Sequence, residues 1–252
     1  MSGIIKPGLV SVTFRSRIIE EIVLLCADTG LSVIEWGGDV HVPHGDTDAA
    51  ELAHDLCHDA GIELGDYASY YNLPADGAGF EDTVITAAAL EAPGIRIWAG
   101  SAGSGETAPE LRDKMTERLR RNAAAAASAG LSLSFEYHGG TLTDNAESAC
   151  RLLKECGADN VFLHWQPNQF RDFEYNLAAL RRVAPYVDCA HVFAWEGDKK
   201  LPLSAHGEMW REYFDILGKS GRCRSALLEF LPCEDEDNLR RDSETLRGIL
   251  GV

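Results

Sequence analysis

The chain alternates between two spacings of its apolar residues. Short runs rich in β-branched and aromatic residues are separated by longer stretches in which apolar residues recur every three or four positions, and this pattern repeats about every 30 residues. The short runs are typical of strands and the longer stretches of helices. The eight predicted strands cover residues 8–15, 32–36, 63–70, 95–100, 132–137, 160–166, 188–195 and 226–231.

The longer stretches end with the residues expected at helix ends. These predicted helices include residues 16–28, 48–60, 109–129, 145–156 and 206–219. A glycine that ends a helix readily takes the left-handed conformation needed there. Four glycines follow predicted helices and precede predicted strands: Gly30, Gly61, Gly130 and Gly157.

Strands alternating with helices predict a parallel sheet, which either closes into a barrel or stays open. The first predicted strand continues as TFRSR and lacks the G-x-G-x-x-G turn of a dinucleotide-binding open sheet. The length of 252 residues is close to the roughly 250 of a one-domain barrel. We therefore predict an α/β fold in which residues 1–252 form a single (β/α)8 TIM barrel, with its active site at the C-terminal mouth of the strands.

Composition narrows the possible partners and the compartment. The net charge of −17 repels phosphate backbones and no basic groove is visible, so no nucleic-acid partner is expected. No apolar run approaches the roughly 18 residues of a membrane span, and the N-terminus does not resemble a secretory signal. Seven scattered cysteines without CxxC spacing indicate reduced thiols. We expect a cytoplasmic protein with no membrane partner; a homo-oligomer remains open.

Polar residues gather at the ends of the last four predicted strands. Glu136 lies in SFEYHGG, His164 and Gln166 in FLHWQPN, His191 in CAHVFAW and Glu229 in ALLEFLP. A carboxylate that follows a buried strand needs a partner, and no Lys or Arg falls at these four ends. One divalent metal ion fits this donor set, Mn²⁺ or Mg²⁺ best and Co²⁺ or Zn²⁺ next. The alternative is that each glutamate pairs with a barrel arginine and His191 is a core histidine.

These strand ends, together with the segments IEWGGDVHVPHGD and RIWAG, resemble the xylose-isomerase-like superfamily of sugar (phosphate) isomerases and epimerases. The resemblance covers essentially the whole chain and implies that Glu136, His191 and Glu229 bind the metal with a fourth ligand from strand six. That strand usually carries Asp followed three residues later by His, which FLHWQPNQ lacks. We prefer Gln166 to His164 as this ligand, because it shares the strand face and lies nearer the mouth.

The resemblance implies a metal-dependent isomerase or epimerase acting on a small ketose or sugar-like carbonyl substrate. Glu136 and Glu229 would transfer the α-proton as catalytic acid and base, through a metal-stabilised enediolate. Two alternatives remain open: an inosose-dehydratase-like lyase, and a non-catalytic sugar-binding barrel that has lost its metal. An apurinic endonuclease is disfavoured, because strands three and four end in SYY and WAG without histidine.

Several further residues are candidates for substrate contact. Trp98, Trp165 and Trp195, like Trp36, lie at or near strand ends and would either stack on a sugar or pack in the barrel. His41 follows strand two and is suited to bind a substrate hydroxyl. Arg96, inside strand four, would pair with Glu35 or Glu136, or else meet an anionic substrate group. The tryptophans and the acidic balance favour a neutral sugar or polyol ketone over a sugar phosphate.

Overall fold

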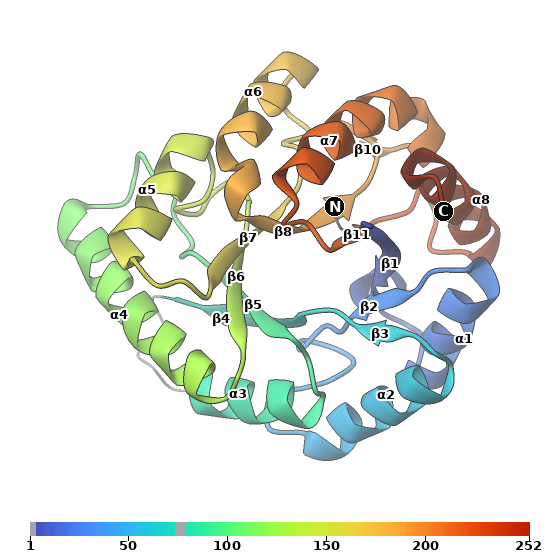
Figure 1. The fold of residues 1–252 in the computed structure, drawn as a ribbon, viewed down its shortest axis with the longest axis horizontal. Helices are drawn as coiled ribbons and strands as arrows, with labels where there is room; N and C mark the ends of the chain where they lie inside the picture. Colours follow the sequence, from blue (N-terminus) through green and yellow to red (C-terminus); the bar gives the residue numbers. More distant parts are fainter. Residues whose placement is uncertain (1–3, 74–78) are drawn as a thin grey trace.

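Nine parallel strands form a curled sheet at the centre of the computed structural model, which describes residues 4–73 and 79–252 (Figure 1). Around the sheet the order is β3 (Glu63–Leu64), β2 (Val33–Glu35), β1 (Lys6–Val10), β11 (Ser225–Leu228), β8 (Val187–Val192), β7 (Val161–Trp165), β6 (Ser132–Glu136), β5 (Gly94–Trp98) and β4 (Tyr67–Asn72).

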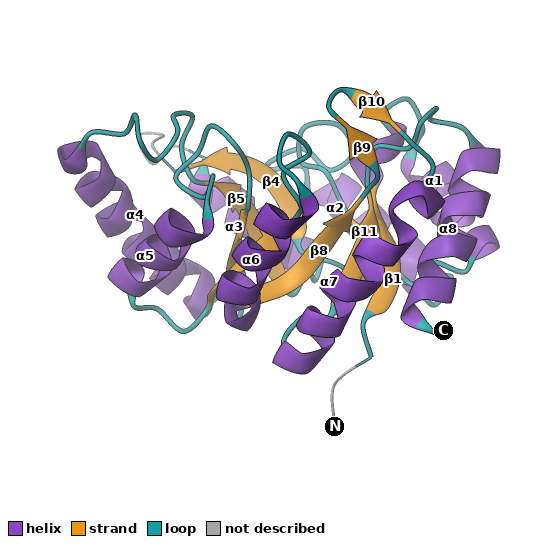
Figure 2. Ribbon diagram, turned by 90° about the horizontal axis from the view of Figure 1, so that it is seen from above, coloured by secondary structure: helices purple, strands orange, loops and turns teal. Residues whose placement is uncertain are grey.

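Helices surround this sheet on its outer side in Figure 1. They are α1 (Ile19–Thr29), α2 (Thr47–Asp59), α3 (Phe80–Ala89), α4 (Pro109–Ser128), α5 (Ala146–Cys156), α6 (Phe173–Val183), α7 (Gly207–Ser220) and α8 (Glu236–Leu250). The predicted TIM barrel is therefore confirmed. Figure 2 shows the barrel from the side, with the short hairpin of β9 (Trp195–Glu196) and β10 (Lys199–Lys200) at the mouth and the N-terminus at the opposite end.

The barrel closes through a strand that is broken in two. β3 and β4 together form the predicted third strand, interrupted at Gly65 and Asp66; β3 pairs with β2 and β4 pairs with β5. The Ala68 N–H donates to the Trp36 carbonyl at 2.9 Å, and the Gly38 N–H donates to the Ala68 carbonyl at 2.9 Å. These bonds join β2 to β4 and complete the ring.

Three strand ends differ from the predicted ones by three residues or more, each for a local reason. The first strand stops at Val10, where a short 3₁₀ helix (Ser11–Phe14) replaces its predicted second half. The seventh stops at Val192, so that Trp195 begins the separate β9–β10 hairpin. The eighth stops at Leu228, because Phe230 has a left-handed backbone (φ 58°) that breaks the pairing.

The predicted helix ends are correct. All four glycines have left-handed φ values: 68° at Gly30, 68° at Gly61, 77° at Gly130 and 69° at Gly157. Four helices start after a side chain that accepts a hydrogen bond from the backbone three residues later, which satisfies an N–H left free by the first helical turn. These caps are Asp46, Asn145, Asp172 and Asp235.

The two faces of the sheet differ in chemistry. The outer face packs on the helices: Trp165 of β7 stacks edge-on against Tyr213 and Trp210 of α7, with ring centroids 4.9 and 6.1 Å apart. The inner face has an apolar patch around Val10 and Leu227, whereas β2 and β5 to β8 contribute buried charged or titratable side chains to the interior. In the described residues, no helix is long and apolar enough to cross a membrane.

A substitution at Gly8 of β1 tests how tightly the side chains of the inner face are packed. A Cβ added at Gly8 would collide with the Val33 carbonyl and lie 2.6 Å from Cδ2 of Leu227. We expect Gly8→Ala to lower the free energy of unfolding by about 1–3 kcal/mol, measured by chemical denaturation. Gly105→Ala is the control, since a Cβ there meets nothing within 4 Å. Equal stability of the two variants would show that β1 and β2 are less tightly packed.

Candidate active site

Strand alternation turns a set of polar side chains into the barrel. On β7, for example, His164 and Gln166 point inward and Trp165 between them points outward. Most core positions of such barrels hold bulky aliphatic residues, so a charged interior indicates chemistry. The buried charged or titratable side chains gathered here are Glu35, Asp66, Arg96, Glu136, His164, Asp188, His191 and Glu229.

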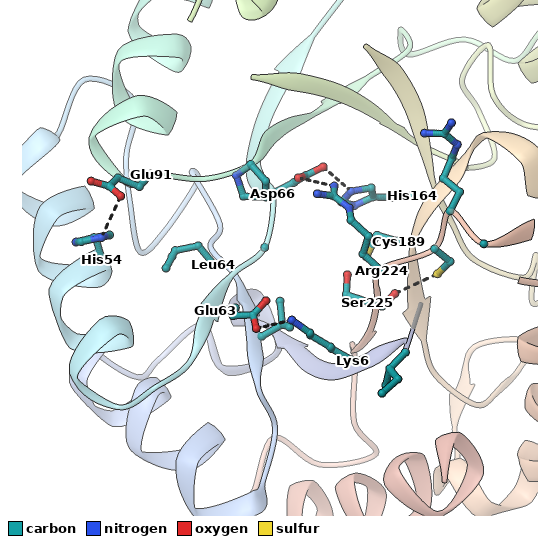
Figure 3. Close-up of a pocket in the computed structure, with 17 residues that line it drawn as sticks. Lys6, His54, Glu63, Leu64, Asp66, Glu91, His164, Cys189, Arg224 and Ser225 are labelled. Atoms are coloured by element: carbon teal, nitrogen blue, oxygen red, sulfur yellow. Dashed lines mark hydrogen bonds and ion pairs between the residues drawn. The ribbon is translucent and has the colours of Figure 1, made fainter. Parts of the chain in front are cut away.

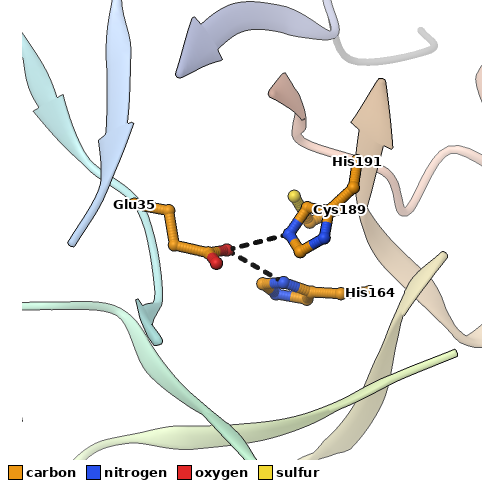
Figure 4. Close-up of side chains that lie close together, drawn as sticks. All are labelled: Glu35, His164, Cys189 and His191. Atoms are coloured by element: carbon orange, nitrogen blue, oxygen red, sulfur yellow. Dashed lines mark hydrogen bonds and ion pairs between the residues drawn. The ribbon is translucent and has the colours of Figure 1, made fainter. Parts of the chain in front are cut away.

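Glu35 lies at the centre of this set and is fully buried. Arg96 Nε donates to its Oε1 at 2.9 Å, while His164 Nδ1 and His191 Nε2 lie 3.0 and 3.3 Å from its Oε2 (Figure 4). Burial alone would raise the pKa of Glu35, but Arg96, His191 and His164 outweigh it and hold the pKa well below its ordinary value. Glu35 is therefore a buried carboxylate that orients three other groups.

A cavity of about 270 Å³ opens at the C-terminal mouth, next to this centre. It holds both glutamates, the glutamine and two of the tryptophans that the sequence singled out. The full lining is Tyr70, Trp98, Glu136, His138, Gln166, Gln169, Phe193, Trp195, Glu229 and Phe230. Two lining residues, Tyr70 and Phe230, have left-handed backbones (φ 56° and 58°), a strain typical of functional sites.

The two glutamates of this mouth cavity have unlike surroundings. Glu136 is ion-paired with Arg96 Nη1, and Gln166 Nε2 donates to it at 3.1 Å. Glu229 Oε2 has no hydrogen-bond partner among the described residues, and neither has His191 Nδ1, 3.6 Å away. Burial, with a contribution from Glu136, raises the pKa of Glu229 to about 7.

The partner of Glu136 corrects one step of the sequence argument. A metal was inferred because no Lys or Arg falls at the ends of strands five to eight, but Arg96 reaches Glu136 from strand four. Arg96 thus makes the pairs with Glu35 and Glu136 that the sequence offered for it. For Glu229 the inference of a metal ion still holds, because its buried Oε2 faces Nδ1 of His191 and neither atom has a hydrogen-bond partner among the described residues. An ion between these two atoms would satisfy both.

Two groups of buried side chains have donor spacing consistent with a divalent metal, within 4.8 Å: Glu35–His164–Cys189–His191 and Asp66–His164–Asp188. In the first group, burial raises the pKa of Cys189 well above its ordinary value, which disfavours a thiolate ligand. The sequence did not predict Glu35, Asp66, Asp188 or Cys189 as donors. For Glu35 and Cys189 the signal was a polar residue at an inward position of a strand, whereas Asp66 lies in the break between β3 and β4 and Asp188 at a register shift between β7 and β8.

His164 belongs to the deeper layer of the interior. It is absent from the lining of the mouth cavity, whereas Gln166, one pleat further along the strand, is part of it. Burial opposes a charge on His164, but Glu35 and Asp66 raise its pKa to about 10. Burial and the Asp66 carboxylate in turn raise the pKa of Asp188 to about 7.

Two predicted substrate contacts are corrected by their positions. Trp165 lies on the outer face of β7, against α7, because it alternates with His164 and Gln166. His41 turns away from the mouth cavity: its Nδ1 lies 2.9 Å from Ser11 Oγ, and its ring packs on Trp36. The sequence missed Tyr70 and Phe230, since their left-handed backbones break the alternation from which facing directions are inferred.

The fold and the site together define a class of protein: a TIM barrel with an acid-rich interior that could hold a metal ion and with aromatic side chains at its mouth. The chain belongs to the Xylose isomerase-like TIM barrel family, whose model matches residues 23–248.

Three known proteins are similar to the chain. A 3-dehydroshikimate dehydratase of Bacillus anthracis is 27% identical over 180 residues, which span 64% of this chain and 63% of the relative. The structure of the probable 3-DHS dehydratase AsbF from Bacillus anthracis is similar with a TM-score of 0.77 and 19% identity, covering 96% of this chain and 98% of that one. A D-psicose 3-epimerase from Clostridium cellulolyticum H10 has a TM-score of 0.74 and 16% identity, covering 98% and 99%.

The raised pKa of Glu229 predicts a pH-dependent stability. Between its ordinary value of 4.5 and about 7, folding keeps a proton on Glu229 that the unfolded chain releases, so stability falls as pH rises through this window. Glu229→Gln removes this loss. In chelator-treated protein we expect the Tm of this variant, relative to the parent, to be higher at pH 8 than at pH 5. The exposed Glu234→Gln is the control, and a pH-independent difference for Glu229→Gln would contradict the assignment.

Proposed function

We propose that this chain is a divalent-metal-dependent enzyme that removes the proton next to the carbonyl of a small hydroxy ketone, with Glu229 as the general base. One observation carries the proposal: Glu229 is a buried carboxylate on the wall of the mouth cavity, and its Oε2 has no hydrogen-bond partner among the described residues. A carboxylate oxygen without a partner at the cavity wall is free to accept a proton from a bound substrate.

His191, Glu229, Gln166 and Glu136 are the proposed ligands of one ion, Mn²⁺ or Mg²⁺ by the chemistry of the donors. When bound, the ion would polarise the substrate carbonyl and make the neighbouring proton more acidic. The protein supplies the orientation. Glu35 holds the Nε2 side of His191, which leaves Nδ1 directed towards Glu229, and Arg96 fixes Glu136.

Dehydration is the outcome that this geometry supports best. Returning a proton to the opposite face needs a second group that can carry a proton there, yet both oxygens of Glu136 already have partners, one in Arg96 and the other in Gln166. Eliminating a hydroxyl needs one base and one acid, and His138 is a further titratable side chain on the cavity wall. Glu229 would take the α-proton, and His138 would protonate the departing hydroxyl, which leaves as water. The dehydratase relative is in keeping with this reaction.

Epimerisation or 1,2-isomerisation is the second candidate. Glu136 and Glu229 line the same cavity, as a two-carboxylate proton transfer requires. The substrate would then be a ketose, and Glu136 would return the proton that Glu229 removes.

Substrate α-proton exchange with deuterated solvent tests the base. With Mn²⁺ present, we expect Glu229→Gln to lower the exchange rate by a factor on the order of 10² to 10⁴, because the variant lacks a basic oxygen. Glu136→Gln separates the two reactions. In an epimerase this variant would still exchange the α-proton but would form no product. In a dehydratase it would still exchange the proton and form product, each at a reduced rate. Suitable probes are 3-dehydroshikimate and D-fructose.

Unchanged exchange in a folded, metal-loaded Glu229→Gln protein would refute Glu229 as the base. No exchange and no metal binding in the parent protein would leave a sugar-binding barrel.

The class of substrate is suggested by Lys200, a lysine next to two residues of the mouth cavity. Lys200 Nζ lies 5.8 Å from the ring centroid of Trp195 and 5.3 Å from that of Phe230, both cavity residues. No carboxylate of the described residues is ion-paired with it. We propose that Lys200 binds the carboxylate of an anionic substrate such as 3-dehydroshikimate, in contrast to the neutral sugar expected from the sequence.

Lys200→Met tests this assignment, since it keeps the length of the side chain and removes its charge. We expect KM for a carboxylated hydroxy ketone to rise about tenfold with little change in kcat. Lys199→Met, the exposed neighbour on the same hairpin, is the matched control. Equal KM values for the Lys200→Met and Lys199→Met variants would refute the assignment of Lys200 to substrate binding.

A further inference from the structure

A second set of convergent donors lies at the opposite end of the barrel from the mouth. Asp66 Oδ2 is 3.0 Å from His164 Nε2, and Asp188 Oδ1 is 3.8 Å from the same nitrogen. Ser134 Oγ lies 3.1 Å from Asp66 and 2.9 Å from Asp188. The four residues come from four separate segments of the barrel wall and all are buried.

Two carboxylate oxygens of this set are buried without a hydrogen-bond partner among the described residues: Asp66 Oδ1 and Asp188 Oδ1. Asp66 is 4% exposed and Asp188 2%, so both side chains are almost entirely removed from bulk solvent. Buried carboxylates in this state need a cation. Arg224 comes near, with Nη2 at 3.6 Å from Asp66 Oδ1 and 3.4 Å from Asp188 Oδ2, but its side chain is 54% exposed.

His164 faces a carboxylate with each of its two ring nitrogens. One ring nitrogen of a ligating histidine faces the metal and the other usually donates to a carboxylate. The Nδ1 of His164 faces Glu35 at 3.0 Å, and its Nε2 faces Asp66 and Asp188. His191 uses Glu35 in the same way from the other side, with its far nitrogen directed towards Glu229 in the mouth. Glu35 thus stands between two imidazoles that serve opposite ends of the barrel.

A pocket at the base gives access to two of these donors, Asp66 and His164, and a neighbouring pocket reaches Asp188. The first pocket has a volume of about 500 Å³ and reaches Asp66, His164 and Arg224, which converge in Figure 3. The long, half-exposed side chain of Arg224 lies over the carboxylates and is able to swing outward. An ion therefore has a route to this set that does not pass through the mouth.

We infer that Asp66, His164 and Asp188 form a second divalent-cation site at the base of the barrel, with Arg224 as a displaceable cover. Two carboxylates, an imidazole and a nearby hydroxyl suit Mn²⁺, Co²⁺ or Zn²⁺. In the metal-free protein, Arg224 and His164 contact the carboxylates. The ion joins the β3–β4 junction to β7 and β8, so its role is to stabilise the barrel.

Counting bound Mn²⁺ on the full-length protein by electron paramagnetic resonance tests the inference. We expect two equivalents on the parent, one on Asp188→Asn, one on His191→Ala and none on the double variant. Arg224→Gln keeps every proposed ligand and removes a competing charge, so it should bind the base ion about tenfold more tightly. Arg222→Gln is the matched control, since that neighbour bonds to the Pro185 carbonyl instead.

The outcomes for the two ends of the barrel are separable. One equivalent that is lost in His191→Ala and kept in Asp188→Asn overturns the base site and leaves the mouth site intact. One equivalent that is lost in Asp188→Asn and kept in His191→Ala supports the base site and overturns the proposed metal at the mouth. If Asp188→Asn does not fold, Arg224→Gln decides: unchanged Mn²⁺ affinity and an unchanged rise of Tm with Mn²⁺ overturn the base site.

Discussion

The Glu35 carboxylate is the interaction on which the rest of the interior depends. It is fully buried, and it contacts Arg96, His164 and His191. On its far side, Arg96 contacts Glu136, His164 contacts Asp66 and His191 faces Glu229. The Glu35 carboxylate therefore sets the direction of three other side chains. Buried ion pairs add little net stability, because desolvation offsets their attraction. The value of Glu35 is therefore geometric: it holds each side chain in one orientation.

Arg96 makes the two mouth glutamates chemically unequal. It binds Glu35 and Glu136 together, while among the described residues the ion-pair partner of Glu229 is the more distant imidazole of His191. Neighbouring carboxylates whose surroundings differ in this way commonly take different roles in catalysis. Residue identity alone would treat the two as equivalent, as both are glutamates that follow buried strands. The difference arises from a cation supplied by another strand.

Local patterns in the sequence predicted the strands, the helices and the residues that share a face. The shared direction of His164 and Gln166, and the glycines that end helices, follow from rules that span a few residues. The pairing of Arg96 with Glu35 or Glu136 was expected, but the resulting difference between Glu136 and Glu229 and the left-handed Phe230 were not predictable in this way. The first depends on the order of strands around the ring, and the second on a backbone break that no residue preference announces.

A register shift between β7 and β8 explains another part of the site that the sequence concealed. Leu163 is paired with Val187, but His164 is paired with Cys189, so Asp188 is skipped. Because Asp188 is skipped, the strict alternation of inward and outward side chains breaks at this point. Neighbouring residues Asp188 and Cys189 therefore both place a possible metal-binding atom inside the barrel. Such a bulge is set by the fit between neighbouring strands, which is not encoded in the alternation of either strand alone.

The junction of β2 and β4 is the least tightly bonded part of the ring. β3 has two residues, and beyond it an isolated bridge between Gly37 and Ala68 completes the closure. Thermal breathing of a closed sheet begins where the fewest bonds must break. Glu35 lies on one lip of this junction and Asp66 on the other. Each opening would briefly separate these two carboxylates, so the barrel could exchange water and ions with its interior while the other strand pairs stay intact.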